Sequence, residues 1–387
     1  MTISSHFDLD LKALLREIEG AGFLLTLVGG APRDYLLDST ISQDLDFEVR
    51  NQDISVLKKF FSSKKIPCTA LPYDILRVPF NDYDLEFSLP RLEKNLPDNK
   101  THHHFEATLI KDLSYEEAFK RRDFTINAIG IELNMHSGTE VIRDPYGGVE
   151  DLKKKVLKYI STDFFLDSVR FLRLIRFSIK YSFTIDSKIL KDIGKFNLLK
   201  LSKHHFLEEM MKSKAPGFFI NKFNELVELY KLEIWDEYLA IKGITFDESC
   251  ETKEDLLVWA FFEKKSQCEA LASFLKLSDK KLKDLKSFEQ SFKKISNVTL
   301  EMLQTIAKTP LAEIKDFEIL KELKNLEEKK EWRKYFLERL KKDQRKLLVS
   351  WEDWEDIKIE NRERDATPQI LRSYIKFHKA LQRGIND

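Results

Sequence analysis

Two carboxylates, Asp44 and Asp46, lie two residues apart in DLDFEVR, a stretch that alternates polar and apolar residues. Residues two apart on a β-strand project from the same face, so the two carboxylates would repel each other unless a cation lay between them. A hard ion such as Mg²⁺, which takes oxygen ligands and retains several waters, would relieve that repulsion. Glu86, in the alternating stretch YDLEFSLPR, could add a third carboxylate from a paired strand. The alternative is a solvent-facing strand that binds no metal.

A glycine pair points to a phosphate site near these carboxylates. Gly29 and Gly30 end the apolar run FLLTLVGG, and a helix is expected to begin near Pro32. Glycines let a phosphate approach the backbone, and a helix N-terminus supplies free N–H donors and a positive dipole. Arg33 adds a forked donor for phosphate oxygens. Polyphosphate beside metal-binding carboxylates indicates nucleotidyl transfer, in which metal ions activate a 3′-hydroxyl and steady the departing pyrophosphate.

A second charged group lies on the periodic amphipathic segment 165–183, which predicts a helix. Asp167 and Arg170, at i and i+3, would share a face and act on one base edge. Asp accepts hydrogen bonds and Arg only donates them, which suits the amino donor and ring acceptor of cytosine and adenine. Uracil and guanine present the reverse order and would leave buried groups unpaired. The pair therefore predicts acceptance of CTP and ATP; a plain ion pair on a helix is the alternative.

The elements that position these residues fall into two parts. The first part carries strand signals over residues 23–30, 44–50, 83–91 and 125–133, although the first four residues of the last could equally close a helix. ISVLKKFFSS has helical spacing, and DPYGG at 144–148 is a turn cluster and a natural domain edge. From about Glu150 onward the pattern is helical, with no convincing strand.

Composition sets further bounds. A chain of 387 residues predicts two or more domains, and a charged fraction of 34% suggests long helices with ion-paired faces. The formal net charge is zero, so partner choice depends on local patches. The three cysteines show no paired spacing, which fits a reducing compartment. No apolar run approaches the roughly 20 residues that span a bilayer, and no secretory signal is recognisable, so a cytoplasmic location is predicted.

Five segments, in one order, resemble the class II (bacterial-type) tRNA nucleotidyltransferases and poly(A) polymerases, and most nearly the CCA-adding enzymes. The segments are LVGGAPRDYLLDSTISQDLDFEV, EFSLPRLEK, RRDFTINAI, DPYGGVEDL and FFLDSVRFLRLIRF. The resemblance implies an α+β fold, with a small polymerase β-like nucleotidyltransferase head built on a mixed sheet and an all-α remainder. It implies a catalytic head over residues 1–149, a nucleotide-reading neck over 150–215, a body over 216–300 and an RNA-binding tail over 301–387.

The resemblance also implies an activity and a set of site residues. The expected reaction is template-independent addition of C and A from CTP and ATP to the tRNA 3′ end. Catalysis would depend on Asp44, Asp46 and Glu86, with two Mg²⁺ ions on the two aspartates. The expected nucleotide-binding residues are Gly29, Gly30, Arg33, Arg122, Asp123, Asn127, Asp167, Arg170, Arg173 and Arg176. Asp123 is assigned to the ribose and Arg122 to nearby phosphate or ribose contacts.

Other parts of the chain carry weaker expectations. Residues 92–110 include three consecutive histidines and resemble a mobile loop linked to the switch from C to A addition, rather than a metal site. The basic run 321–346 would suit RNA phosphates, or it is a solvated charged face. The resemblance implies that the helical body and tail bind the acceptor end and elbow of tRNA.

Several alternatives remain open at the level of sequence. Leu166 and Ser168 stand where the family usually has Glu and Pro, and His204–His205 replace a usual Glu-Arg pair. Within the family, the alternatives are a CC-only enzyme and a poly(A) polymerase. From a different class, the alternative is a non-catalytic RNA-binding relative. Retention of Asp44 and Asp46 argues against the last, because a binding protein does not need metal ligands.

Overall fold

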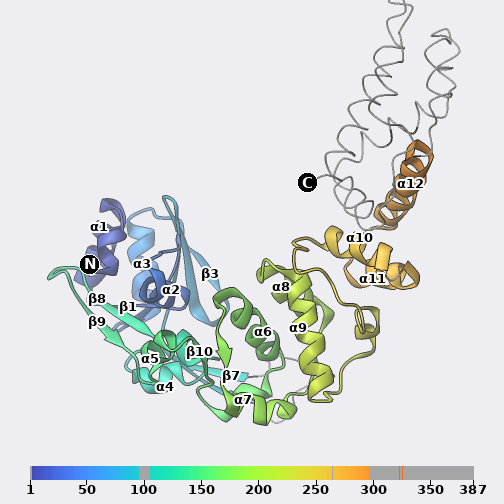
Figure 1. Ribbon diagram of the computed structural model, residues 1–387. Helices are drawn as coiled ribbons and strands as arrows, with labels where there is room; N and C mark the ends of the chain where they lie inside the picture. The colour runs from blue at the N-terminus through green and yellow to red at the C-terminus, as the bar shows by residue number, and fades with distance from the viewer. Residues whose placement is uncertain (1, 96–104, 264, 297–321, 323–324, 326–387) are drawn as a thin grey trace, which may run out of the picture. The chain divides into compact units, whose positions relative to one another are not determined.

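The computed structural model describes residues 2–95, 105–263, 265–296, 322 and 325 (Figure 1). The chain divides into two compact units, Met1–Tyr238 and Leu239–Asp387, and each is described by itself. The finer division at residues 149, 215 and 300 stays a prediction. Among the described residues, no helix is both long and apolar enough to span a bilayer.

A seven-stranded mixed sheet forms the centre of the head, with the order β3-β4-β5-β2-β1-β8-β9. The strands are β1 (Leu24–Val28), β2 (Asp44–Arg50), β3 (Thr69–Leu71), β4 (Ile75–Phe80), β5 (Tyr83–Ser88), β8 (Gly130–Asn134) and β9 (Thr139–Arg143). Strands β2 and β5 run parallel, whereas the other neighbours are antiparallel. The strands predicted within 23–30, 44–50 and 83–91 are all present.

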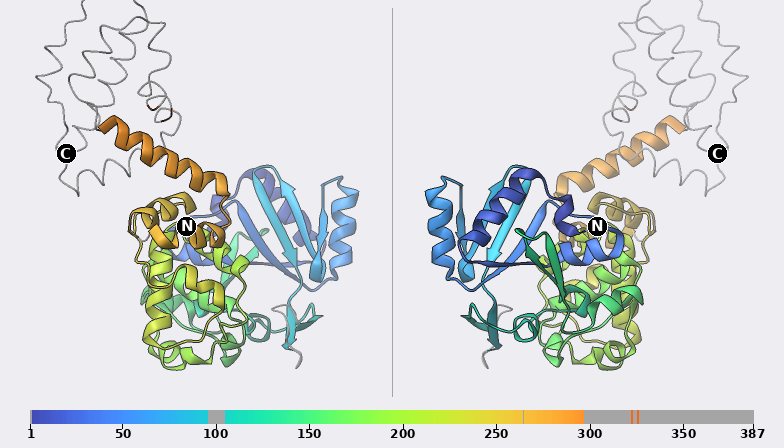
Figure 2. Two further views of the ribbon diagram at one scale, coloured as in Figure 1. Left: turned by 90° about the vertical axis from the view of Figure 1, so that its right-hand side faces the viewer. Right: turned by 90° about the vertical axis from the view of Figure 1, so that its left-hand side faces the viewer.

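The main core of the head lies on one face of this sheet, between the strands and the blue helices in Figure 2. Phe47 on β2 stacks on Phe87 on β5, with ring centroids 5.2 Å apart. The core is completed by η1 (Ile3–His6), α1 (Leu9–Gly20) and α3 (Ile54–Ser63), whose apolar residues belong to the same buried cluster. Because side chains alternate along a strand, burial of Leu45 and Phe47 sends the neighbouring acidic residues to the opposite face.

Short helical elements complete the head. They are α2 (Gly30–Asp38), η2 (Pro72–Asp74), α4 (Tyr115–Phe119), η3 (Thr125–Asn127) and α5 (Gly148–Lys153). For residues 125–133 the helical alternative is right at the start, because Thr125–Asn127 is a 3₁₀ turn and β8 begins only at Gly130. The turn is fixed by Thr125, whose N–H donates to Lys158 O and whose hydroxyl donates to Asp151.

The segment predicted to be a mobile loop, 92–110, is partly described. Its ends are β6 (Arg91–Asn95) and β7 (Phe105–Leu109), which pair as an antiparallel two-stranded sheet. The three consecutive histidines lie outside the described residues. The expectation of mobility therefore stays a prediction.

The rest of the first unit is mainly helical. Its elements are β10 (Val156–Leu157), η4 (Thr162–Leu166), α6 (Val169–Tyr181), β11 (Thr184–Ile185), α7 (Ser187–Asp192), η5 (Ile193–Lys195), α8 (Lys203–Lys212) and α9 (Pro216–Leu229). The expectation of no strand after Glu150 is wrong at one point, because β10 and β11 pair in parallel over two residues each. Helix α6 packs on α8 and α9 through the fully buried rings of Phe171, Phe206 and Phe223.

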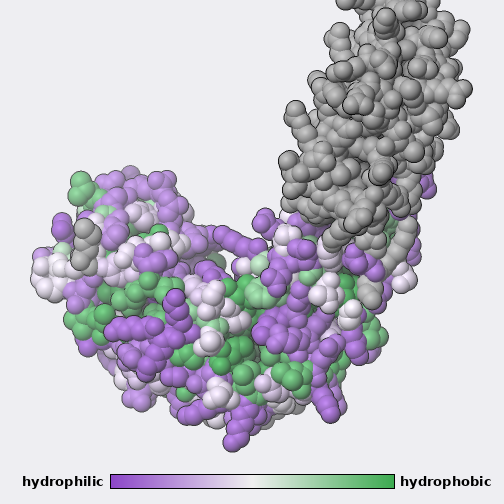
Figure 3. Space-filling model, in the orientation of Figure 1, coloured by the Kyte–Doolittle hydropathy of each residue, from purple (hydrophilic) through white to green (hydrophobic). Residues whose placement is uncertain are grey.

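The described part of the second unit is helical. It contains α10 (Lys253–Glu263), η7 (Lys265–Gln267), α11 (Cys268–Phe274) and α12 (Asp279–Ser296), while η6 (Asp236–Ala240) spans the boundary between the units. The predicted basic run 321–346 lies outside the described residues except at positions 322 and 325. The visible face of the described residues is largely hydrophilic, with smaller apolar patches (Figure 3).

Candidate active site

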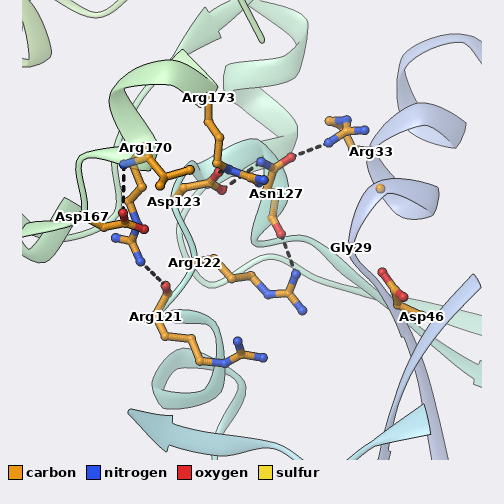
Figure 4. A pocket seen from close by; sticks show the side chains of 12 residues that line it. Gly29, Arg33, Asp46, Arg121, Arg122, Asp123, Asn127, Asp167, Arg170 and Arg173 are labelled. Carbon is orange, nitrogen blue, oxygen red and sulfur yellow. Dashed lines mark hydrogen bonds and ion pairs between the residues drawn. The ribbon is translucent and has the colours of Figure 1, made fainter. Parts of the chain in front are cut away.

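A pocket of about 520 Å³ lies in the first unit, between the head and the start of α6 (Figure 4). It is lined by Gly29, Gly30, Arg33, Asp46, Arg121, Arg122, Asp123, Asn127, Asp167, Val169, Arg170 and Arg173. Five arginines face three aspartates in this lining, so the pocket has an excess of positive charge. Such a pocket favours a polyanionic ligand such as a triphosphate.

The glycine turn allows β1, α2 and Asp46 to approach each other closely. Gly29 has φ +77°, and a Cβ at this position would lie 2.3 Å from Asp46 Oδ2. Helix α2 begins at the next residue and has no side-chain cap, so its first N–H groups are available at the pocket. The predicted phosphate approach at Gly29 and Gly30 therefore has the backbone geometry that it requires.

Replacing Gly29 with Ala is expected to lower the free energy of unfolding by about 2 to 4 kcal/mol, through positive-φ strain plus the clash with Asp46. Gly138→Ala is a matched control, because Gly138 has φ +71° but open space around its missing Cβ. Denaturant unfolding of both variants separates strain from clash. Equal losses for the two variants would show that Asp46 does not restrict the position, and the account of the turn would be wrong.

The acidic face of the sheet gathers more carboxylates than the sequence indicated. Asp44 and Asp46 are exposed on either side of buried Leu45, and the parallel register sets Glu86 beside Asp46 and Asp84 beside Asp44. Adjacent strands lie about 4.8 Å apart. Asp84 is neutralised by Arg77, whose Nε is 2.9 Å from Asp84 Oδ1. The predicted pairing of the Glu86 strand with the Asp44–Asp46 strand is therefore present.

The electrostatics of Asp46 favour a bound cation. Although the side chain reaches the pocket opening, the surrounding protein and then the charge of Glu86 raise the pKa of Asp46 to about 6. Within the part of the chain that the structure describes, no three acidic, histidine or cysteine residues form a cage for a metal. Mg²⁺ commonly takes one or two carboxylates and completes its shell with substrate phosphates and water. The donor set fits an ion of that kind that binds together with a nucleotide.

Two neighbouring arginines, Arg121 and Arg122, line the pocket. The Nε atoms of Arg121 and Arg122 are buried and have no hydrogen-bond partner within the described residues. Arg121 Nη1 donates to Glu93 at 3.3 Å, and Arg122 Nη1 donates to Asn127 O at 3.2 Å. Burial, followed by repulsion from Arg122, lowers the pKa of Arg121 to about 10, so it stays charged at neutral pH. Because both arginines line the pocket and carry forked, positively charged donors, the pair suits an anionic ligand.

Asp123 connects the head to α6. Its carboxylate accepts from Phe124 N at 2.8 Å, from Asn127 Nδ2 at 2.9 Å and from Arg173 Nε at 2.6 Å. Burial alone would raise its pKa, but the charge of Arg173 and these hydrogen bonds lower the pKa of Asp123 to about 2. Arg173 lines the pocket but is held by Asp123, which limits its reach toward a phosphate.

The depressed pKa of Asp123 predicts a pH-dependent contribution to stability. An unfolded aspartate titrates near 3.9, so the ionised group stabilises the fold above that pH by roughly 2 to 3 kcal/mol. The contribution is lost as pH falls from about 4 toward 2. Asp123→Asn is therefore expected to have a lower free energy of unfolding than the wild type at pH 6, and the difference is expected to shrink toward pH 3. Urea unfolding measures both free energies across this range. A difference that does not change with pH would contradict the assignment.

Asp167 and Arg170, the predicted base-reading pair, are arranged differently from the prediction. Asp167 precedes α6 rather than lying on it, with φ −107° and ψ 107°, and its Oδ1 accepts from Val169 N at 2.9 Å. Arg170 Nε is 3.9 Å from Asp167 Oδ2, and Arg170 Nη2 donates to Arg121 O at 2.7 Å. The expectation that the two residues share a helix face is wrong because the helix begins only at Val169. Both side chains nevertheless line one pocket (Figure 4).

Three predicted site residues lie outside the pocket lining: Asp44, Glu86 and Arg176. Arg176 was expected to bind the nucleotide, but its Nε donates to the buried Glu209 on α8 at 2.6 Å. Arg33 lines the pocket but is only 6% exposed, and two of its nitrogen atoms donate to Asp34 and Asn127. Sequence reasoning missed Arg121 and Val169, and the doubled arginine in RRD was the available signal for the first.

Comparison with known proteins agrees with this site. A family model described as the poly A polymerase head domain matches residues 25–158. Residues 25–158 are thus similar to this family of head domains over about a third of the chain. The matched segment includes the glycine turn, Asp46 and the paired arginines, all of which line the pocket.

Two curated relatives are named as a CCA-adding enzyme and an A-adding tRNA nucleotidyltransferase. The chain is 30% identical over 216 residues to the CCA-adding enzyme of Pediococcus pentosaceus, across 54% of this chain and 51% of the relative. It is 30% identical over 228 residues to the A-adding tRNA nucleotidyltransferase of Aquifex aeolicus, across 57% of this chain and 26% of the relative. The chain thus spans about half the length, or less, of these curated relatives.

The fold agrees with a solved structure beyond the head domain. The crystal structure of the Bacillus stearothermophilus CCA-adding enzyme in complex with CTP is 19% identical, with a TM-score of 0.54. The match covers 76% of this chain and 73% of that protein. This likeness concerns the fold, and it confirms the α+β class with a mixed-sheet head followed by helices.

Proposed function

We propose that this protein is a tRNA nucleotidyltransferase that adds C and A from CTP and ATP to the tRNA 3′ end and releases pyrophosphate. One observation carries the proposal: a single pocket combines Asp46, the Gly29–Gly30 turn and the Asp167–Arg170 pair. The first two suit a metal-bound triphosphate, and the third suits a base edge. The names of the relatives support tRNA as the acceptor.

Different residues of the site would bind the triphosphate and the metal ion. The N-terminus of α2, with Arg121 and Arg122, would hold the triphosphate through N–H donors. Asp44 and Asp46, with Glu86 beside them, would hold Mg²⁺, which when bound supplies activation of the RNA 3′-hydroxyl and charge neutralisation at the leaving pyrophosphate. Together, the N–H donors and the metal ligands would place the α-phosphorus in line with the acceptor hydroxyl. Positioning and electrostatic stabilisation would then supply most of the rate enhancement.

Base selection would rest on the other side of the pocket. Asp167 accepts from the exocyclic amino group of cytosine or adenine, and Arg170 donates to the adjacent ring nitrogen. Arg170 is steadied by its bond to Arg121 O, and Asp167 by its bond to Val169 N. Because both groups are anchored, they form a template that the wrong bases cannot satisfy.

A second candidate has specific support. The A-adding relative from Aquifex aeolicus matches this chain at the same identity as the CCA-adding relative, so addition of only part of CCA is consistent with the head domain. A poly(A) polymerase and a non-catalytic RNA-binding protein are the remaining alternatives.

Nucleotide choice and metal dependence test the proposal together. A tRNA transcript that lacks CCA is incubated with each of the four nucleoside triphosphates in turn, with Mg²⁺ or after EDTA treatment. We expect CTP to be incorporated, UTP and GTP to be rejected, and all incorporation to stop without metal. Incorporation that continues with EDTA, or equal use of CTP and UTP, would contradict the proposed site.

A further inference from the structure

A chain of hydrogen bonds runs from the C-terminal end of α6 into the head. Tyr181, the last residue of α6, donates its hydroxyl to Asp34 Oδ1 at 2.9 Å. Arg33 Nε donates to the same oxygen at 2.8 Å, and Arg33 Nη1 donates to Asn127 Oδ1 at 2.5 Å. The Arg33 guanidinium also lies over the rings of Phe177 and Tyr181, at 5.2 Å and 4.9 Å from their centroids. Two residues of α2 thereby join α6 to the η3 turn.

The chain of bonds then returns to α6. Asn127 Nδ2 donates to Asp123 Oδ1 at 2.9 Å, and Arg173 on α6 donates to Asp123 Oδ2 at 2.6 Å. Asn127 thus accepts from Arg33 and donates to Asp123, which fixes the orientation of its amide. The six residues form a closed circuit whose two ends lie on one helix, and Figure 4 shows the part from Arg33 through Asn127 and Asp123 to Arg173.

The spacing of the two attachment points gives the circuit its mechanical effect. Arg173 and Tyr181 are eight residues apart, which corresponds to about 12 Å along an α-helix. Attachment at one point would leave a helix free to tilt, whereas attachment at two points fixes both its position and its tilt. Arg170 lies one turn before Arg173, so a tilt of α6 would move the base-reading groups relative to the glycine turn.

We propose that this circuit positions the base-reading end of α6 against the head, and that Tyr181, outside the pocket lining, is a positioning residue for nucleotide selection. The proposal rests on the proposed function, because it assumes that the pocket selects among nucleotides. Tyr181 acts through Asp34 and Arg33 and does not touch the nucleotide. Small displacements at a reading site weaken selection because the discriminating hydrogen bonds depend on geometry.

Tyr181→Phe tests the proposal, because it removes the hydroxyl and keeps the ring against Arg33. Tyr146→Phe is the matched control, since the Tyr146 hydroxyl donates at 2.6 Å to a backbone oxygen, Glu116 O, outside the circuit. Dissociation constants for CTP and UTP are measured by calorimetry with Mg²⁺ and without RNA, and kcat and KM are measured on a tRNA lacking CCA. We expect Tyr181→Phe to reduce the preference for CTP over UTP about fivefold, mainly by weakening CTP binding, while Tyr146→Phe leaves it unchanged.

A conservative variant adds a rescue. Asp34→Asn retains the Oδ1 that accepts from Tyr181 and Arg33, so it is expected to keep most of the preference. Asp34→Ala removes that acceptor and is expected to match Tyr181→Phe, with the double variant no worse than either single variant.

The outcomes separate the two proposals. A wild-type protein that binds CTP selectively but extends no RNA would contradict the proposed function, and the binding preference of Tyr181→Phe would still decide the positioning role. An unchanged preference in Tyr181→Phe, or an equal loss in Tyr146→Phe, would overturn the positioning role alone. A wild-type protein that binds CTP and UTP equally would overturn both.

Discussion

Asp46→Ala is expected to reduce nucleotide incorporation at least about a thousandfold while RNA binding stays intact, because the metal ion would lose its pocket-facing ligand. Gel extension assays measure incorporation, and filter binding of labelled tRNA measures affinity. The same substitution also removes the negative charge that lies beside Glu86 in the strand register. The combination of lost turnover and retained binding distinguishes an enzyme from an RNA-binding relative.

Asp84→Ala is the matched control for that variant. Asp84 lies beside Asp44 in the register of the same sheet face, but it pairs with Arg77 and does not line the pocket. Its incorporation rate is expected to stay within about threefold of wild type. If Asp46→Ala also stayed within threefold, the assignment of Asp46 as a metal ligand would fail.

Asp167→Asn is expected to reduce the preference for CTP over UTP about 10- to 100-fold, mainly by admitting UTP. An amide can turn its NH₂ group toward the O4 of uracil, which a carboxylate would repel. The fold should survive, because Asn Oδ1 can still accept from Val169 N as Asp167 does. The measurement is kcat/KM for each nucleotide on a tRNA lacking CCA.

Asp163→Asn makes the same chemical change four residues earlier, on η4, at an exposed position that does not line the pocket. It is expected to leave nucleotide preference at the wild-type value. A preference unchanged in Asp167→Asn would remove that residue from base selection and leave Arg170 as the sole candidate reader.

Much of the head was predictable because its signals are local. The alternation in DLDFEVR defined the face that carries Asp44 and Asp46, and the structure buries Leu45 and Phe47 on the other face. The run that ends at Gly29 and Gly30 gave both the strand and the close approach that only glycine permits there. For these residues, the alternation of polar and apolar residues and the residue types are enough to predict the local structure.

The errors have physical causes that local patterns do not contain. The buried rings of Phe164 and Phe165 on η4 extend the apolar spacing of α6 backward, so periodicity placed Asp167 inside a helix that begins after it. Arg176 looked like a phosphate donor because its partner Glu209 lies 33 residues away in the chain. Strands of two residues, such as β10 and β11, are too short to show alternation.

The site also contains contacts that only the tertiary structure defines. Sequence reasoning assigned Arg33 to phosphate, but its stacking on Phe177 and Tyr181 depends on how α2 packs against α6. The RRD motif predicted a basic pair. It did not predict that the Nε atoms of both arginines would be buried without hydrogen-bond partners among the described residues. Long-range pairing thus decides which of several arginines bind a ligand and which hold the fold.

The most direct test of the central claim is extension of defined tRNA ends, read at single-nucleotide resolution. Three transcripts ending before CCA, after CC and after CCA are incubated with Mg²⁺, CTP and ATP, beside an unrelated RNA. The account predicts addition of CCA to the first, of A to the second and of nothing to the third or to the unrelated RNA. Long A tails on any of these RNAs, or no extension of any transcript, would contradict it.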